Sequence, residues 1–237
     1  MPTAAMVVIG DEILSGKVVD TNSPWLAGQL RELGVDLVRI VVVPDAVDRI
    51  AEEIVRCSAL VDHVFTTGGV GPTHDDMTLE GIASAFDVPL VRHPELESLL
   101  REKTGDQPTD AALRMADVPE GTELWWEGDL FFPVVVMGNV HIFPGVPSLF
   151  QRKFKEVAHR FSGTVVESRC FVTLERESVI AGRLLDAQER WPQVAIGSYP
   201  QFDRKPWTVT ITMDSRDPDA LTECEAALLA AIETVTP

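Results

Sequence analysis

Short apolar runs alternate with helix-like stretches along the first half of the chain. The runs at 4–9 and 35–43 are almost entirely apolar, which predicts strands covered on both faces, and 62–67 is a third predicted strand. Leucine, isoleucine and valine recur at helical spacing after Ser23-Pro24 and after Asp45, so Ser23 and Asp45 are the predicted helix N-caps. This one-step alternation indicates βαβ units and a mostly parallel sheet.

Further helices and a hairpin are predicted up to residue 161. The segment PVVVMGNVHIF (133–143) predicts a β-hairpin that turns at Gly138-Asn139, because a glycine in first position suits a type II′ turn. The remaining predicted helices lie at 77–86, 94–103, 109–117 and 148–161.

A different order of elements begins at Gly163. The predicted elements are a strand at 165–174, a helix at 177–190, strands at 193–199 and 207–213, and a helix at 218–233. We therefore predict a three-layer α/β/α domain with a mostly parallel sheet over residues 1–162, and a small α+β domain (β-α-β-β-α) over residues 163–237.

A glycine-rich loop, TTGGVGPTHDDMT (66–78), follows the third strand and precedes a helix. The absence of side chains at Gly68, Gly69 and Gly71 lets backbone N–H groups close on an anion, and the next helix presents its positive end to that anion. Thr73 and Asp76 have the spacing of a capping box, so Asp76 either caps the helix or holds a metal. A tight turn with ordinary capping explains the loop alone equally well.

Other polar loops follow strands of the same predicted sheet. Asp11, Glu12 and Asn22 lie in the loop after the first strand, and Asp45 follows the second. The loop FPGVP, with Pro144 and Gly145, follows the hairpin. Each loop alone has a plain structural reading: a solvated loop, an N-cap or a connector. Ligands of open α/β sheets, however, bind at the carboxyl ends of the strands. The coincidence of several such loops favours one shared binding site.

The charge balance limits the partners. The chain has 37 acidic and 20 basic residues, a net charge of −17, which repels nucleic acid and anionic lipid. A phosphorylated ligand then needs local compensation from backbone N–H groups, a helix N-terminus or a divalent cation. No apolar run reaches the ~18 residues of a membrane span, and the N-terminal segment reads as a strand, not a signal peptide, so a cytoplasmic location is expected. The three cysteines form no metal-binding or disulfide pattern.

Several motifs together resemble a known family. GDEIL, SGK, DTN, VVPD, TTGGVGPTHDDMT, NVHIFPGVP and GSYP make the chain similar to the molybdopterin-binding (MoaB/Mog-like, MoCF) domain family. The most similar branches are the N-terminal domains of CinA and of eukaryotic FAD synthase. The sequence departs from many CinA proteins at Thr73-His74-Asp75-Asp76, where they have T-P-D-D, and at Pro44-Asp45, where they often have Gly-Asp. These departures favour the FAD-synthase-like branch.

The resemblance implies a pterin or a nucleotide as the small-molecule partner, bound at the Gly/Asp loop. It also implies divalent-metal-dependent cleavage of FAD or ADP-ribose (with Mg²⁺, Mn²⁺ or Co²⁺, and K⁺) and, since family members often self-associate, a homo-oligomer. The hypothesis is hydrolysis of a nucleotide pyrophosphate that releases AMP. A molybdopterin adenylyltransferase and a non-catalytic binding module are the alternatives. No amidase or FAD-synthesising domain is recognisable, so neither of those activities is implied.

The hypothesis assigns a role to each candidate residue. Catalysis is assigned to Asp76, Asp11 and Asp45, and metal binding to Asp76, Asp11 and Glu12. The predicted contacts to phosphate and substrate are Gly68, Gly69, Gly71, Thr73, Asn22, Pro144 and Gly145.

Overall fold

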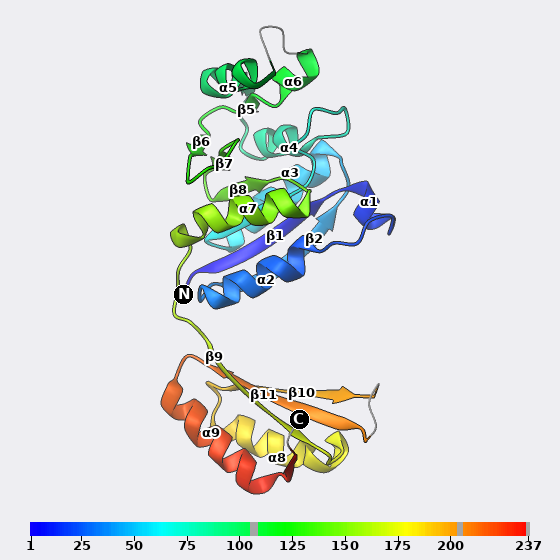
Figure 1. Cartoon of the computed structure of the whole chain (residues 1–237), viewed down its shortest axis with the longest axis vertical. Coiled ribbons are helices and arrows are strands. Elements are labelled where there is room, and N and C mark those ends of the chain that lie inside the picture. Colours follow the sequence, from blue (N-terminus) through cyan, green and yellow to red (C-terminus); the bar gives the residue numbers. More distant parts are fainter. Residues whose placement is uncertain (105–108, 203–205, 236–237) are drawn as a thin grey trace. The chain divides into compact units, whose positions relative to one another are not determined.

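The computed structural model describes residues 1–104, 109–202 and 206–235, which form two compact units, Met1–Gly163 and Thr164–Pro237 (Figure 1). The first unit contains a six-stranded sheet. Its strands, in spatial order, are β2 (Asp36–Val43), β1 (Thr3–Ile9), β3 (His63–Thr67), β8 (Val140–Phe143), β7 (Val134–Met137) and β6 (Glu123–Trp125). The first four are mutually parallel, and β7 and β6 are antiparallel to their neighbours.

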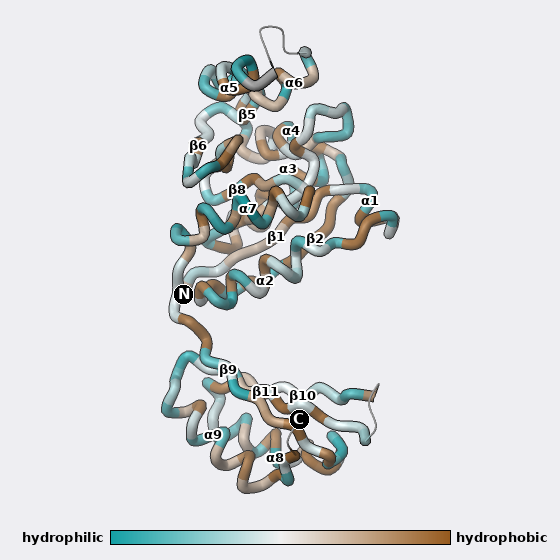
Figure 2. The backbone as a smooth tube through the Cα atoms, viewed as in Figure 1, coloured by the Kyte–Doolittle hydropathy of each residue, from teal (hydrophilic) through white to brown (hydrophobic). Residues whose placement is uncertain are grey.

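Helices cover both faces of this sheet, so the predicted three-layer α/β/α architecture is confirmed. On one face α2 (Asn22–Glu32) and α7 (Pro147–Val157) pack on alternate residues of β1. On the other face α3 (Val47–Leu60) and α4 (Thr78–Ala85) pack on the remaining residues of β1. Figure 2 shows hydrophilic and hydrophobic residues alternating along α7, as expected of a helix with one buried face.

Short elements complete the first unit. They are α1 (Asp11–Leu14), β4 (Leu90–Arg92), α5 (Pro94–Thr104), α6 (Asp110–Arg114), β5 (Asp117–Pro119) and the 3₁₀ turn η1 (Ala158–Arg160). The hairpin between β7 and β8 turns at Gly138, whose φ of +58° fits the predicted type II′ turn. The helix predicted at 109–117 ends at Arg114, because Asp117 starts β5 and pairs with Arg92 of β4. The predicted N-cap Ser23 is wrong, because α2 begins at Asn22.

The second unit has its own core. It consists of β9 (Glu167–Thr173), α8 (Glu177–Arg190), β10 (Ala195–Gln201), β11 (Thr208–Ser215), α9 (Pro218–Ala231) and β12 (Thr234–Val235). The strands form an antiparallel sheet in the order β10-β11-β9-β12, and both helices pack against it. The predicted β-α-β-β-α order is observed, with β12 added. Among the described residues no helix is long and apolar enough to cross a membrane.

A buried histidine predicts a pH-dependent stability for the first unit. His141 on β8 is 3 % exposed, and its Nε2 lies 3.3 Å from His63 Nδ1. Its ring packs against Phe65, Trp125 and Phe161. Burial, followed by the charge of His63, lowers the pKa of His141 to about 3. The neutral ring is therefore the form that the folded chain accommodates.

We expect the chain to lose stability as the pH falls below about 6.5, the ordinary pKa of histidine. Below that pH the unfolded chain binds a proton that folded His141 does not, at a cost of about 1.4 kcal/mol per pH unit. In His141→Phe this part of the slope should disappear, as urea denaturation at pH 6.5 and pH 5 will show. His159→Gln, at a histidine side chain that is 62 % exposed, is the control and should keep the wild-type slope.

Candidate functional site

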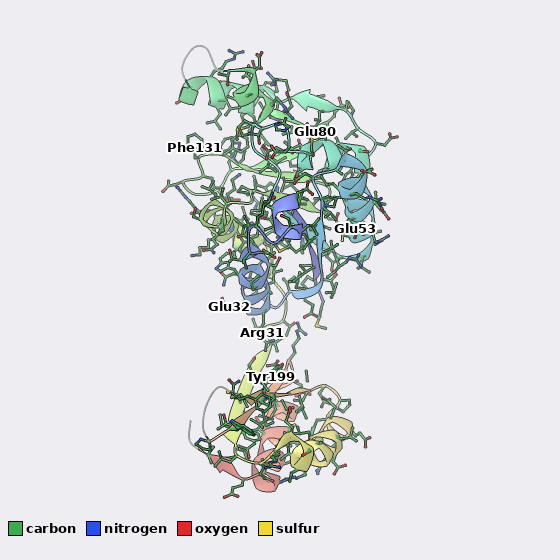
Figure 3. All side chains as sticks on the ribbon, turned by 90° about the vertical axis from the view of Figure 1, so that its right-hand side faces the viewer. Arg31, Glu32, Glu53, Glu80, Phe131 and Tyr199 are labelled. Atoms are coloured by element: carbon green, nitrogen blue, oxygen red, sulfur yellow. The ribbon has the colours of Figure 1, made fainter. Side chains whose placement is uncertain are left out.

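Four parallel strands bring the polar loops to one edge of the first unit. Strands β1, β2, β3 and β8 all end there, and their loops contain Asp11, Asp45, Gly68 and Pro144. Figure 3 faces this edge, with α1 near the centre and Glu80 of α4 labelled above it. The loops are thus neighbours in space although they are far apart in the sequence.

Asp45 joins two of these loops. Its Oδ2 accepts a hydrogen bond of 2.9 Å from the backbone N–H of Asp11. A Cβ placed on Gly69 would lie 3.4 Å from Asp45 Oδ1, so the carboxylate lies between the first loop and the glycine-rich loop. The prediction that Asp45 is an N-cap is wrong: Ala46 precedes α3, and no side chain caps it. The carboxylate is bound to the Asp11 amide instead.

The surroundings of Asp45 disfavour its charged form. Burial has the largest effect and raises the pKa of Asp45, whereas the hydrogen bond from the Asp11 amide lowers it. The negative charges of Glu12, Asp11 and Asp75 raise the pKa further. A half-buried carboxylate among other carboxylates is the arrangement that a bound cation or a proton relieves.

The glycine-rich loop depends on two unusual backbone conformations. Gly68 and Gly69 have φ values of +105° and +57°. A Cβ on Gly68 would lie only 2.0 Å from the carbonyl oxygen of Ile9, so the ends of β3 and β1 approach more closely than any side chain allows. Thr78 fixes the loop: its Oγ1 donates to the Gly68 carbonyl (2.8 Å) and its N–H donates to the Gly69 carbonyl (3.0 Å).

The amides of Gly69 and Gly71 lack a protein acceptor: in the described part of the chain neither N–H group donates to a protein oxygen. Unpaired amides in a loop that precedes a helix are suited to bind an anion.

Asp76 binds within its own loop. Its Oδ2 accepts from the Thr73 N–H (2.8 Å) and from the Thr73 hydroxyl. A Cβ on Gly71 would lie 2.7 Å from the same oxygen. Asp76 therefore does not cap α4, whose N-cap position is Met77, and among the described residues it makes no hydrogen bond to Asp11 or Glu12. Of the predicted metal ligands, Glu12 and Asp76 line different hollows beside the glycine-rich loop.

Two hollows flank Gly68 and Gly69. The larger, about 80 Å³, is lined by Val8, Ile9, Glu12, Ile13, Val18, Val19, Asp20, Thr21, Asn22, Thr67, Gly68, Gly145 and Pro147. The smaller, about 40 Å³, is lined by Gly69, Val70, Gly71, Asp76, Leu79, Glu80, Leu90, Arg114 and Asp117. The loop after β1, the glycine-rich loop and the FPGVP loop therefore each line one or both hollows, and the loop of Asp45 lines neither.

Asn22 holds one wall in place. It is 5 % exposed, and its Nδ2 donates to Thr67 Oγ1 (2.9 Å) and to the Gly145 carbonyl (2.8 Å). Thr67 Oγ1 in turn donates to the Pro144 carbonyl (3.1 Å). Asp20 Oδ1 accepts from the backbone N–H groups of Asn22 and Ser23, so this carboxylate binds the first amides of α2. The side-chain N–H groups of Asn22 therefore donate to acceptors within the protein.

The acidic residues do not form a metal cage by themselves. Among the described residues no three histidine, cysteine, aspartate or glutamate side chains are grouped so that they could hold a metal ion. Mg²⁺ is usually held by one or two carboxylates together with phosphate oxygens and water. The exposed Asp11 and Glu12 and the half-buried Asp45 offer such oxygen donors, so these residues fit a cation that arrives with a phosphorylated ligand.

One residue of the site was not found from the sequence. Arg114, at the end of α6, donates from Nη1 to the Thr73 carbonyl (3.3 Å) and from Nη2 to Glu80 Oε1 (3.2 Å). It is 41 residues away from Thr73, in a helix with no unusual composition. No sequence pattern distinguishes it from an ordinary surface arginine.

Both units of the chain are similar to known protein families. Residues 5–162 match the family described as "Probable molybdopterin binding domain", and residues 165–236 match "FAD synthase, middle domain". A protein of Archaeoglobus fulgidus is 34 % identical over 90 % of both chains. The probable FAD synthase of Caenorhabditis elegans is 34 % identical over 92 % of this chain, which spans about half (48 %) of that relative.

A solved structure shows the same fold in the first unit. The protein CinA from Thermoplasma acidophilum superposes with a TM-score of 0.63 at 30 % identity, covering 68 % of this chain and 98 % of that one. A CinA-like protein of Myxococcus xanthus is 37 % identical over 68 % of this chain and 40 % of its own length. The resemblance expected from the motifs is confirmed on both branches.

Proposed function

We propose that this chain, which belongs to the family of probable molybdopterin binding domains, is a divalent-metal-dependent hydrolase of nucleotide pyrophosphates. The substrate class is FAD or ADP-ribose, and AMP is one product. Relatives named probable FAD synthase, and the match of the second unit to a FAD synthase domain, support a nucleotide as the ligand. The chain spans only about half of those relatives, so their whole activity is not transferred to it.

The observation that carries the proposal is the position of Asp45 beside the glycine-rich loop. Asp45 Oδ1 lies next to Gly69, and Oδ2 binds the Asp11 amide. Anion-binding amides and a carboxylate whose charge is disfavoured thus occur within one small volume. A diphosphate with its cation complements both.

The residues of the chain would divide the work as follows. The amides of Gly69 and Gly71 bind phosphate oxygens, with Gly68 giving the close approach of the backbone. The Thr73 hydroxyl turns from Asp76 to a phosphate oxygen. Gly145 lines the wall that Asn22 holds in place, and the Pro144 carbonyl, which accepts from Thr67, fixes the backbone beside it.

The carboxylates would hold the cation. Asp11, Glu12 and Asp45 would supply oxygens to the cation, whereas Asp76, which lines the smaller hollow, would orient Thr73. A divalent ion held there would supply charge neutralisation of the diphosphate and activation of water. Hydrolysis adds one water molecule across the P–O–P bond and leaves two phosphate monoesters.

Release of AMP from FAD and from ADP-ribose tests the proposal. The purified full chain is incubated with Mg²⁺, Mn²⁺ or Co²⁺, with and without K⁺, and AMP is quantified. We expect AMP release that EDTA abolishes and excess metal restores, because the carboxylates hold no phosphate without the cation. Release that is unchanged in EDTA would contradict the metal requirement.

Two other outcomes select the alternatives. Consumption of ATP in the presence of molybdopterin, without cleavage of FAD or ADP-ribose, would identify an adenylyltransferase. Tight nucleotide or pterin binding without turnover under any metal would identify a binding module. Either result would overturn the proposal that the chain is a hydrolase.

A further inference from the structure

Arg114 reaches from α6 into the smaller hollow beside the glycine-rich loop. Its guanidinium contacts the Thr73 carbonyl and Glu80, and it lines the hollow with Gly69 and Gly71. Its side chain is 40 % exposed. A guanidinium has five N–H donors, of which these two bonds use two, so further donors remain for a ligand.

The carboxylates around Arg114 have partners of their own. Asp117 binds Arg92 through both carboxylate oxygens. Asp76 accepts from Thr73. Among the described residues only Glu80 shares Arg114, through a single oxygen. Arg114 and the two glycines with unpaired amides line the same hollow, in a chain whose net charge is −17.

The size of the hollow limits what enters it. At about 40 Å³ it exceeds the room that one water molecule needs, but it is far smaller than the ~300–1,000 Å³ of a pocket for a whole small-molecule ligand. It suits one group of a larger ligand. Guanidinium and amide N–H groups together are suited to phosphate oxygens.

We infer that Arg114 is a specificity-determining residue that recognises a phosphate group of the nucleotide, next to the amides of Gly69 and Gly71. The inference rests on the proposed function, because it places the diphosphate at the glycine-rich loop. Glu80 and the Thr73 carbonyl hold the guanidinium in position before the ligand arrives. The chain would then favour phosphorylated nucleotides over their nucleosides through this side chain.

Calorimetric titration of the full chain tests this role. Wild type, Arg114→Ala, Arg114→Lys and the control Arg101→Ala are titrated with ADP-ribose, AMP and inorganic pyrophosphate in Mg²⁺, and adenosine is the phosphate-free comparison. Arg101 is an exposed arginine on α5 that pairs with Glu97 and lines neither hollow. We expect Arg114→Ala to lower the affinity for the three phosphorylated ligands about tenfold to a hundredfold. Arg114→Lys should recover part of this loss, and Arg101→Ala should match wild type.

Adenosine separates recognition from a merely structural role. If Arg114 only stabilises the loop, Arg114→Ala weakens the binding of adenosine and of the phosphorylated ligands by the same factor. That result would overturn the inference. Unchanged affinity for the phosphorylated ligands, or no binding of them by wild type, also overturns it. Phosphate-dependent binding that needs Arg114 but is accompanied by no release of AMP supports the inference and refutes the hydrolase. The two proposals therefore fail separately.

Discussion

Replacing Gly68 by alanine should abolish nucleotide binding and lower the melting temperature of the chain by roughly 6–12 °C. The new Cβ would lie 2.0 Å from the Ile9 carbonyl oxygen, and the backbone at Gly68 has a φ of +105°. Since the obstacle is backbone and not a flexible side chain, β1 and β3 must separate at their ends. Backbone strain and a displaced strand end together cost about 3 kcal/mol. Differential scanning calorimetry and titration with ADP-ribose measure the two effects.

Gly28→Ala is the matched control. Gly28 lies within α2, and a Cβ there has no atom within 4 Å, so this alanine should stabilise the chain by about 0.5–1 kcal/mol and leave binding unchanged. Gly71→Ala adds a second test, because φ is not positive there and the three atoms nearest to the new Cβ all belong to the Asp76 carboxylate. It should weaken binding with little loss of stability. Normal binding by Gly68→Ala would show that the ligand does not use this loop.

Replacing Asp45 by asparagine should lower the turnover of FAD or ADP-ribose about a hundredfold or more while the free energy of unfolding stays the same or rises. The amide side chain has nearly the same shape but cannot supply a charged oxygen to a cation, and metal-ion catalysis accounts for several kcal/mol of a reaction barrier. The pKa of Asp45 is raised by burial and by Glu12, Asp11 and Asp75, so its charge destabilises the folded chain near neutral pH. The contribution of Asp45 to the free energy of unfolding is most favourable below the ordinary pKa of aspartate, where the carboxyl is protonated, and this contribution is lost as the pH rises.

The combination of lower activity and unchanged or higher stability distinguishes a functional carboxylate from a structural one. Asp48→Asn, at an aspartate with an 80 % exposed side chain on α3, should change neither property. Steady-state kinetics and urea denaturation are measured on the same samples. If Asp45→Asn keeps full turnover, or if it loses activity only in proportion to a loss of stability, Asp45 has no part in the chemistry.

The sheet and the edge that holds the candidate site were predictable because they depend on local patterns. Strand β1 is an apolar run that is buried on both faces, as predicted. Strand β2 forms where it was predicted, but the prediction that it is covered on both faces is wrong: it is the edge strand of the sheet, and Val38 and Ile40 are 55 % and 49 % exposed. The helices between the strands follow their helical periods. Once the strands are parallel, their carboxyl ends must share an edge, so Asp11, Asp45 and Gly68 come together without any further information.

Elements of three residues were not predictable in the same way. Strands β4, β5 and β6 are too short to show a period. Strands β4 and β5 form because they pair with each other across two helices, and β6 forms because it pairs with the next strand, β7. The end of the helix predicted at 109–117 was wrong for this reason, since pairing of Asp117 with Arg92 competes with helix continuation.

Partners of individual side chains were the hardest part of the site to predict. An aspartate before a helix is ordinarily a cap, yet Asp45 binds the Asp11 amide because the loops of β1 and β2 meet there. Arg114 has no distinguishing sequence context, and only the packing of α6 brings it to Thr73. Such contacts depend on tertiary structure, which a periodic pattern does not contain.

A crystal structure of the full chain with the non-hydrolysable α,β-methylene analogue of ADP-ribose and Mn²⁺ is the most direct test of the account. We predict phosphonate oxygens within hydrogen-bond distance of the Gly69 and Gly71 amides, and an anomalous signal from Mn²⁺ beside Asp45. Two results would contradict the claim that the loops at this edge form one site for a nucleotide diphosphate. One is an analogue bound elsewhere, and the other is an analogue whose phosphonate oxygens accept no hydrogen bond from the Gly69 or Gly71 amide.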